Sequence, residues 1–274
     1  PEIETIILTY LKPSELIRYG TCSRLAFARI ADSISYLYST RRLLQKFFPT
    51  DNDYHRFRET QKRHGVLVSG SQVTGLFVCN TASFTMSDLD LYVNIKKEGF
   101  LATALTQISY SLYTDLSRQQ LDESDDYELV SAMQNQEIIL RAKYVCSAIA
   151  SVKEYHNCDG KIVQVIASHG PLMDIILCFH STCVMNVISY HYAYCLYPSA
   201  TICERVSVAH FGDDINSTRA REKWSARGWC IATEATLSPQ LDLRTVHHYV
   251  GDQYSWRILC EDRLTVTDVL NKNS

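Results

Sequence analysis

Residues Gly65 to Val93 read GVLVSGSQVTGLFVCNTASFTMSDLDLYV, and this stretch decides the predicted fold. It opens with an apolar run, Val66 to Val68, that ends in the small pair Gly70-Ser71. A moderately apolar segment and a polar break follow, before the acidic and apolar run Ser87 to Val93. The pattern predicts two strands joined by an intervening segment, with small residues at the end of the first strand and acidic residues in the second.

The two acidic residues are Asp88 and Asp90, two positions apart where Leu89, Leu91 and Val93 alternate. This alternation predicts a strand with both carboxylates on one face. Two neighbouring like charges are costly to bury unless a cation or hydrogen-bond donors compensate for them. Oxygen ligands at this spacing suit Mg²⁺. The alternative interpretation is an ordinary turn at Asp88, followed by a solvated strand residue at Asp90.

The pair Gly70-Ser71 precedes the acidic run and suits an anionic ligand. A glycine lets a ligand come close to the backbone, and the amide and hydroxyl groups can donate hydrogen bonds to a phosphate. Gly70-Ser71 at a strand end, followed by Asp88-Leu89-Asp90 on the next strand, resembles the signature of the nucleotidyltransferase fold. This superfamily includes polymerase-beta-like enzymes and antibiotic adenylyltransferases.

The resemblance implies that Gly70 and Ser71 bind nucleotide phosphate and that Asp88 and Asp90 bind Mg²⁺ and serve catalysis. The implied reaction moves a nucleoside monophosphate from a nucleoside triphosphate to a hydroxyl acceptor. In the family pattern, a third carboxylate stands on the next sheet strand.

The segment expected to carry that third carboxylate is a hairpin over residues 148–168, because Asn157 to Gly160 is a turn signal. The corresponding residue is Gln164, which offers a neutral oxygen and cannot act as a general base. Asp174 or Glu154 could substitute, but neither falls in register by simple counting. We therefore expect weakened or absent catalysis, a pseudoenzyme that retains nucleotide or metal binding, with an active Mg-dependent enzyme as the alternative.

The N-terminal residues Pro1 to Ile34 show short helical patterns broken near Pro13. They resemble the F-box, a helical module that docks on the Skp-type adaptor of cullin-RING ubiquitin ligases. The resemblance implies that adaptor-binding residues are Ile3, Ile7, Leu11, Pro13 and Leu16. A plain helical cap on the next domain is the alternative. Because the chain starts at Pro1 without methionine, we expect it to be a truncated piece.

Pro49 and the polar residues that follow it predict a module boundary. The expected fold class is α+β, with a helical F-box-like segment at residues 1–48 and a nucleotidyltransferase-like mixed sheet flanked by helices at 49–274. The spacing predicts a helix over residues 99–116 and a loop over 119–128. It leaves Leu172 to Phe179 as a strand or a helix, and a helix starting at Ser181 or Thr182 is expected to run through Ile188.

The segment from Asp213 to Gly228 carries four cations that are candidates for holding a triphosphate. They are Arg219, Arg221, Lys223 and Arg227. Charged residues on a helical surface are more commonly solvated, so both interpretations stay open. The tail around Trp256 predicts short strands.

The composition limits the classes of partner and the compartment that we expect for this chain. The chain has 274 residues, a net charge of −3 and ten cysteines. This charge gives no electrostatic case for bulk binding to nucleic acid or membranes. The N-terminus shows no secretory signal and no apolar run is long enough to span a bilayer, so we expect an intracellular protein, cytoplasmic or nuclear, with reduced thiols. Cys178, His180 and Cys183 hint at zinc, but their apolar context favours buried thiols.

The whole pattern also resembles a group of fungal proteins of unassigned function that join an F-box-like segment to a nucleotidyltransferase-like domain. The stretches that carry this resemblance are Ser69 to Ser71, Ser87 to Val93, Phe179 to Thr182, Met185-Asn186 and Ala193 to Pro198.

Overall fold

A mixed sheet is the centre of the computed structural model, which describes residues 6–8, 10–11, 13–79, 84–115, 148–209, 215–232, 249–252 and 254–260. Among these residues eight strands follow the order β10-β7-β6-β1-β2-β5-β4-β3. Their bounds are β1 Leu67–Ser69, β2 Leu89–Asn94, β3 Ser111–Asp115, β4 Ile149–His156, β5 Ile162–Ser168, β6 Asn186–Ile188, β7 Tyr192–Cys195 and β10 Trp256–Leu259. The neighbours β2 and β5 run parallel, whereas the other described pairs of this sheet are antiparallel.

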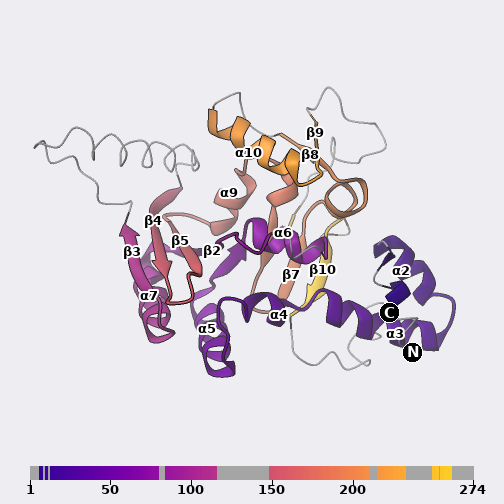
Figure 1. Ribbon diagram of the computed structural model, residues 1–274, viewed down its shortest axis with the longest axis horizontal. Coiled ribbons are helices and arrows are strands. Elements are labelled where there is room, and N and C mark those ends of the chain that lie inside the picture. The colour runs from indigo at the N-terminus through magenta and orange to yellow at the C-terminus, as the bar shows by residue number, and fades with distance from the viewer. Residues whose placement is uncertain are drawn as a thin grey trace, which may run out of the picture.

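Helices flank the sheet, as the α+β class predicts (Figure 1). They are α2 Pro13–Gly20, α3 Arg24–Leu37, α4 Thr40–Leu44, α5 Asp51–His64, α6 Ser71–Phe77, α7 Glu98–Gln107, α9 Leu172–Leu177 and α10 Ile215–Ala226. Short helical turns are η2 Ile95–Lys97, η3 Thr182–Val184 and η4 Ser199–Glu204, and a two-stranded parallel sheet joins β8 Val206–Val208 to β9 Cys230–Ala232. Within the described chain, no helix combines the length and apolarity needed to cross a membrane.

The two faces of the sheet differ in what covers them. Leu89, Leu91 and Val93 of β2 pack into the main core together with residues of α5 and α7. Tyr92 of β2 and Ile166 of β5 point to the other face and pack with α9. In Figure 1, α5 and α7 lie toward the bottom of the view and α9 and α10 toward the top. We call these the α7 face and the α9 face.

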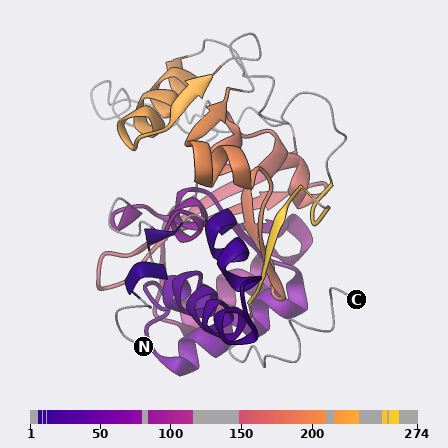
Figure 2. The same cartoon turned by 90° about the vertical axis from the view of Figure 1, so that its right-hand side faces the viewer.

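The N-terminal helices have a small core of their own, in which Leu8, Leu16 and Ile30 are buried. The main core nevertheless reaches upstream of the expected boundary at Pro49, because Tyr38 and Leu44 are buried in it. The Tyr38 ring meets the Trp256 ring of β10 edge-on, with centroids 4.7 Å apart. By packing, residues 38–48 therefore belong with the sheet. Figure 2 looks onto the indigo N-terminal helices, with orange α10 at the top of the view.

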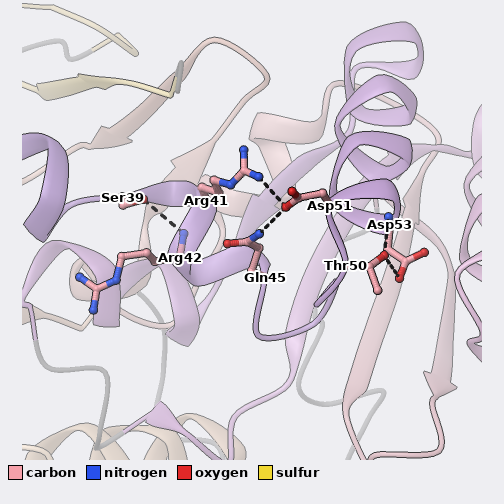
Figure 3. Close-up of polar contacts among 7 residues, drawn as sticks. All are labelled: Ser39, Arg41, Arg42, Gln45, Thr50, Asp51 and Asp53. Atoms are coloured by element: carbon pink, nitrogen blue, oxygen red, sulfur yellow. Dashed lines mark hydrogen bonds and ion pairs between the residues drawn. The ribbon is translucent and has the colours of Figure 1, made fainter. Parts of the chain in front are cut away.

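Polar contacts bridge the expected boundary between α4 and α5 (Figure 3). Asp51 at the start of α5 accepts hydrogen bonds from Arg41 Nη2 at 2.6 Å and from Gln45 Nε2 at 3.2 Å. Thr50 caps α5, since its Oγ1 accepts from the Asp53 amide at 3.1 Å. Ser39 caps α4 by accepting from the Arg42 amide at 3.2 Å. The polar residues after Pro49 therefore form the start of α5, and hydrogen bonds join this start to α4.

The structure confirms some predicted elements and corrects others. The hairpin over 148–168 is confirmed, with β4 and β5 antiparallel and Gly160 in its turn at φ +71°. Residues 172–177 form helix α9. The predicted helix over 99–116 is wrong beyond α7, because Ser109 adopts φ +68° and Ser111–Asp115 pairs with β4 as an edge strand. The predicted loop over 119–128 lies outside the described residues.

The helix expected to run from Ser181 or Thr182 through Ile188 is also wrong. A single 3₁₀ turn at Thr182–Val184 gives way to strand β6, Asn186–Ile188. Val68 of β1 lies opposite Ile188, and β6 pairs with β7 on its other side. Pairing between strands distant in sequence overrides the local helical pattern.

Candidate functional site

Gly70 contacts Asp90 just after the end of β1. Gly70 lies between β1 and α6 with φ +81° and ψ −158°, a conformation that side chains rarely permit. A Cβ atom at Gly70 would lie 2.0 Å from Asp90 Oδ2. Ser71, the first residue of α6, is buried beside it. The structure therefore brings the predicted Gly-Ser pair against the predicted acidic strand, and the glycine is required by close approach as well as by its backbone angles.

The two aspartates occupy different environments. Strand β2 begins at Leu89, so Asp88 stands just before the strand and is half-buried. Asp90 lies within β2 opposite Ser69 of β1, and only 8% of its surface is exposed. Of the two carboxylates that were expected in one strand, only Asp90 lies within β2, and Asp88 immediately precedes the strand.

A row of polar side chains continues across the sheet from Asp90. Gln164 of β5 lies in register with Asp90, which confirms the predicted neighbour of the acidic strand. Glu154 of β4 lies in register with Gln164. The expectation that Glu154 falls out of register was therefore wrong, because the hairpin turn aligns the two arms with Tyr155 opposite Val163 and Glu154 opposite Gln164.

Side-chain contacts tie this row together. Gln164 Nε2 donates a long hydrogen bond of 3.4 Å to Glu154 Oε2. His156 Nε2 lies 2.6 Å from the other oxygen, Glu154 Oε1, and its ring stacks on Tyr113 of β3 at 4.2 Å between centroids. Directly opposed residues of adjacent strands share a face, so Asp90, Gln164 and Glu154 stand side by side. Asp174, the other possible substitute, is exposed on α9.

Buried hydrogen bonds hold the site's supporting elements. Gln72 of α6 donates to the carbonyls of Phe84 at 2.8 Å and Ser87 at 2.6 Å, which fixes the segment leading into Asp88. Asn186 of β6 donates to Thr74 Oγ1 at 3.0 Å. Ser69 Oγ in turn donates to the Asn186 carbonyl at 2.5 Å. The junctions before α6 and β2 are thus both anchored by side chains that are themselves buried.

Arg227, just beyond α10, is a cation that contacts the acidic segment. Its Nη2 donates to Ser87 Oγ at 3.1 Å across 140 residues of sequence. Burial lowers the pKa of Arg227 from its ordinary value, and the charge of Asp88 opposes that shift. The sequence placed Arg227 among four equivalent cations. Of the other three, Arg219 and Lys223 are exposed, and Arg221 donates to Thr218 Oγ1 at 3.2 Å.

Among the described residues, no group of three or more His, Cys, Asp or Glu side chains could hold a metal ion. Mg²⁺ is usually held by one or two carboxylates plus waters and substrate phosphates. The half-exposed Asp88 and the Asp90 carboxylate seated against Gly70 fit that kind of site.

The three residues that could suggest a zinc site, Cys178, His180 and Cys183, have different environments. Cys178 is exposed and Cys183 is buried. Burial raises the pKa of the Cys183 thiol to about 11, which disfavours the thiolate that zinc requires. His180 Nδ1 lies 2.6 Å from Ser181 Oγ.

The residues expected to bind an adaptor also differ from one another. Ile7 is 54% exposed, whereas Leu16 is 1% exposed and Leu11 packs against the same small core. Leu16 therefore stabilises the N-terminal helices in this conformation. Ile3 and the side chain of Pro13 lie outside the described residues. Adaptor binding by these residues stays a prediction.

Comparison of the sequence with models of protein families gives no match, and comparison with curated proteins gives none either.

Proposed function

We propose that this chain binds a nucleoside triphosphate with Mg²⁺ through Asp88, Asp90 and the Gly70-Ser71 junction, and that turnover is weak or absent. The observation that carries the proposal is the strand register that puts Gln164, a neutral side chain, directly beside Asp90. An amide oxygen is a poorer metal ligand than a carboxylate and cannot accept the acceptor hydroxyl's proton.

In this proposal each residue has a defined task. Asp88 and Asp90 would hold Mg²⁺, which supplies charge neutralisation at the phosphates when bound. Gly70 leaves room for the Asp90 carboxylate, and the amide and hydroxyl of Ser71 would donate to phosphate oxygens. The segment before Asp88 is held by Gln72, so the first aspartate is positioned before any ligand arrives.

Calorimetric titration of the chain with ATP and GTP, with and without Mg²⁺, tests the proposal. We expect Mg-dependent binding by the wild type and its loss in the Asp88→Asn/Asp90→Asn variant, because both amides lack the negative charge that the cation needs. Circular dichroism would verify that the variant is folded. Absence of Mg-dependent binding by the folded wild type would contradict the proposal.

The alternative is an active nucleotidyltransferase, which the carboxylate of Glu154 favours because it lies in register beyond Gln164. Release of pyrophosphate from ATP that requires Mg²⁺ and is lost in Asp88→Ala would support this alternative. Catalysis would then come chiefly from positioning and charge stabilisation. Turnover that Asp88→Ala does not change would exclude this site as its source.

A second candidate function is binding to a Skp-type adaptor through the N-terminal helices. Such binding would bring the larger domain into a ubiquitin ligase. The exposed side chains of Ile6, Ile7 and Tyr10, beside a separate small core, favour it. Gel filtration with a purified Skp-type protein should show a complex that Ile7→Asp weakens. Phe100→Asp, at an exposed apolar residue of α7, is the matched control. Co-elution that Ile7→Asp and the control affect equally would contradict this function.

A further inference from the structure

Aromatic rings flank Arg227 beside the segment that leads into Asp88. Its guanidinium carbon lies 4.5 Å from the centre of the Phe84 ring and 5.1 Å from that of Trp224. Both rings belong to a buried cluster that includes Trp229 and Cys183. Phe84 packs so closely on α6 that a Cβ at Gly75 would lie 2.8 Å from its ring. The position of the guanidinium is therefore set by the core and not by solvent.

The hydrogen-bonding capacity of this guanidinium is incompletely used within the described chain. Nη2 donates to Ser87 Oγ, but Nη1 is buried and meets no hydrogen-bond acceptor among the described residues. A buried charged donor without an acceptor destabilises the folded state unless a bound group supplies the acceptor. An arginine's planar fork of donors matches the oxygens of a phosphate and binds them bidentately.

We infer that Arg227 binds the polyphosphate of the ligand at the Asp88 site. This inference deepens the proposed function and rests on it for the identity of the ligand as a nucleoside triphosphate. A cation bound by Asp88 and Asp90 would draw phosphate oxygens to this edge of the sheet, and Arg227 supplies the opposing positive charge. The contact of Arg227 with Ser87 places its fork next to Asp88.

The competing role for Arg227 is purely structural: it would join the end of α10 to the segment before β2. Both roles predict that the residue matters for stability. Only the ligand-binding role predicts a loss that depends on the number of phosphates in the ligand.

The experiment titrates the full chain with Mg-ATP, with inorganic tripolyphosphate plus Mg²⁺, and with adenosine. Arg227→Met keeps an apolar stem against Phe84 and Trp224 but removes the fork. We expect it to weaken binding of ATP and tripolyphosphate about tenfold to a hundredfold, the range for a lost hydrogen bond to a charged group. Adenosine binding should not change, because adenosine carries no phosphate. Arg219→Met, at an exposed residue of the adjoining helix α10, is the matched control and should stay within about twofold.

Equal tripolyphosphate affinity in wild type and Arg227→Met would overturn the inference and leave the proposed function standing if Mg-ATP still binds. Tripolyphosphate binding that depends on Arg227, without ATP binding, would support the inference and contradict the nucleotide ligand. Absence of tripolyphosphate binding by the wild type would overturn the inference. If Arg227→Met does not fold, Arg227→Lys decides: it keeps the charge but not the fork, and we expect about threefold to tenfold weaker binding, with unchanged affinity counting against the inference.

Discussion

The two faces of the central sheet use the same strands in different ways. On the α7 face, β2 contributes Leu89, Leu91 and Val93 to a continuous apolar core. On the α9 face, the same strand contributes Asp90 at one end and Tyr92 further along. Helices α5 and α7 seal the first face, whereas the polar row from Asp90 to Glu154 occupies the second. The difference shows that one strand can stabilise the fold with one set of side chains and offer chemistry with the alternate set.

The largest expected effect comes from opening the α7 face. Leu91→Ala removes a fully buried side chain and leaves a cavity, so we expect it to lower the free energy of unfolding by about 2–5 kcal/mol. Asp90→Asn, one residue away on the α9 face, keeps the shape and removes a buried charge, so its effect should stay within about 1 kcal/mol. Urea unfolding of both variants measures the contrast. Similar losses at the two positions would show that the faces do not divide their roles in this way.

An exchange of two side chains on the α9 face tests the role of the row itself. The double variant Glu154→Gln/Gln164→Glu keeps one amide and one carboxylate, with the hydrogen bond between them reversed. It also puts a carboxylate beside Asp90 without changing net charge. We expect Mg-dependent ATP binding to become about tenfold tighter, because the cation gains an anionic ligand.

The controls for that exchange are the two single variants. Gln164→Glu alone sets three carboxylates side by side, whereas the double variant sets two, so the single variant should be the less stable, since like charges directly opposite each other destabilise a sheet. Glu154→Gln alone leaves the row with two amides and should not tighten Mg-ATP binding. Unchanged Mg-ATP affinity in the double variant would mean that the residue beside Asp90 does not limit metal binding.

The smallest expected effect is the pH dependence that Tyr155, on the α7 face, contributes to stability. Burial, with added repulsion from Glu98 and Asp115, raises the pKa of Tyr155 to about 12. An unfolded tyrosine titrates near pH 10, so the unfolded state loses its proton first as pH rises. The contribution of the protonated Tyr155 to the free energy of unfolding is therefore fully present below about pH 10 and is lost as pH rises toward 12.

Urea unfolding between pH 9 and 11 measures this dependence, with Tyr155→Phe as the matched variant. Phenylalanine cannot ionise, so the fall in stability above pH 10 should be shallower in the variant than in the wild type. Identical slopes in the two proteins would assign the pH dependence to other groups.

Local patterns in the sequence were enough for the elements closest to the site. The alternation around Asp90 predicts β2, and the Asn157 to Gly160 turn predicts the hairpin that brings Gln164 beside Asp90. These features could be predicted because strand alternation and turn chemistry depend on residues only a few positions apart. The same local reasoning failed at Ser111–Asp115 and Asn186–Ile188, where pairing with β4 and with β1 and β7 decides the conformation.

The sequence by itself thus determined the acidic strand, the glycine junction and the neutral residue beside Asp90. Only the tertiary structure decided that Glu154 stands in register beyond Gln164 and that Arg227 reaches Ser87. It also decided that residues 38–48 pack with the sheet, because Tyr38 finds its partner in Trp256. The physical reason is common to all three: each depends on contacts between segments distant in sequence, and no local propensity encodes which distant segments will meet.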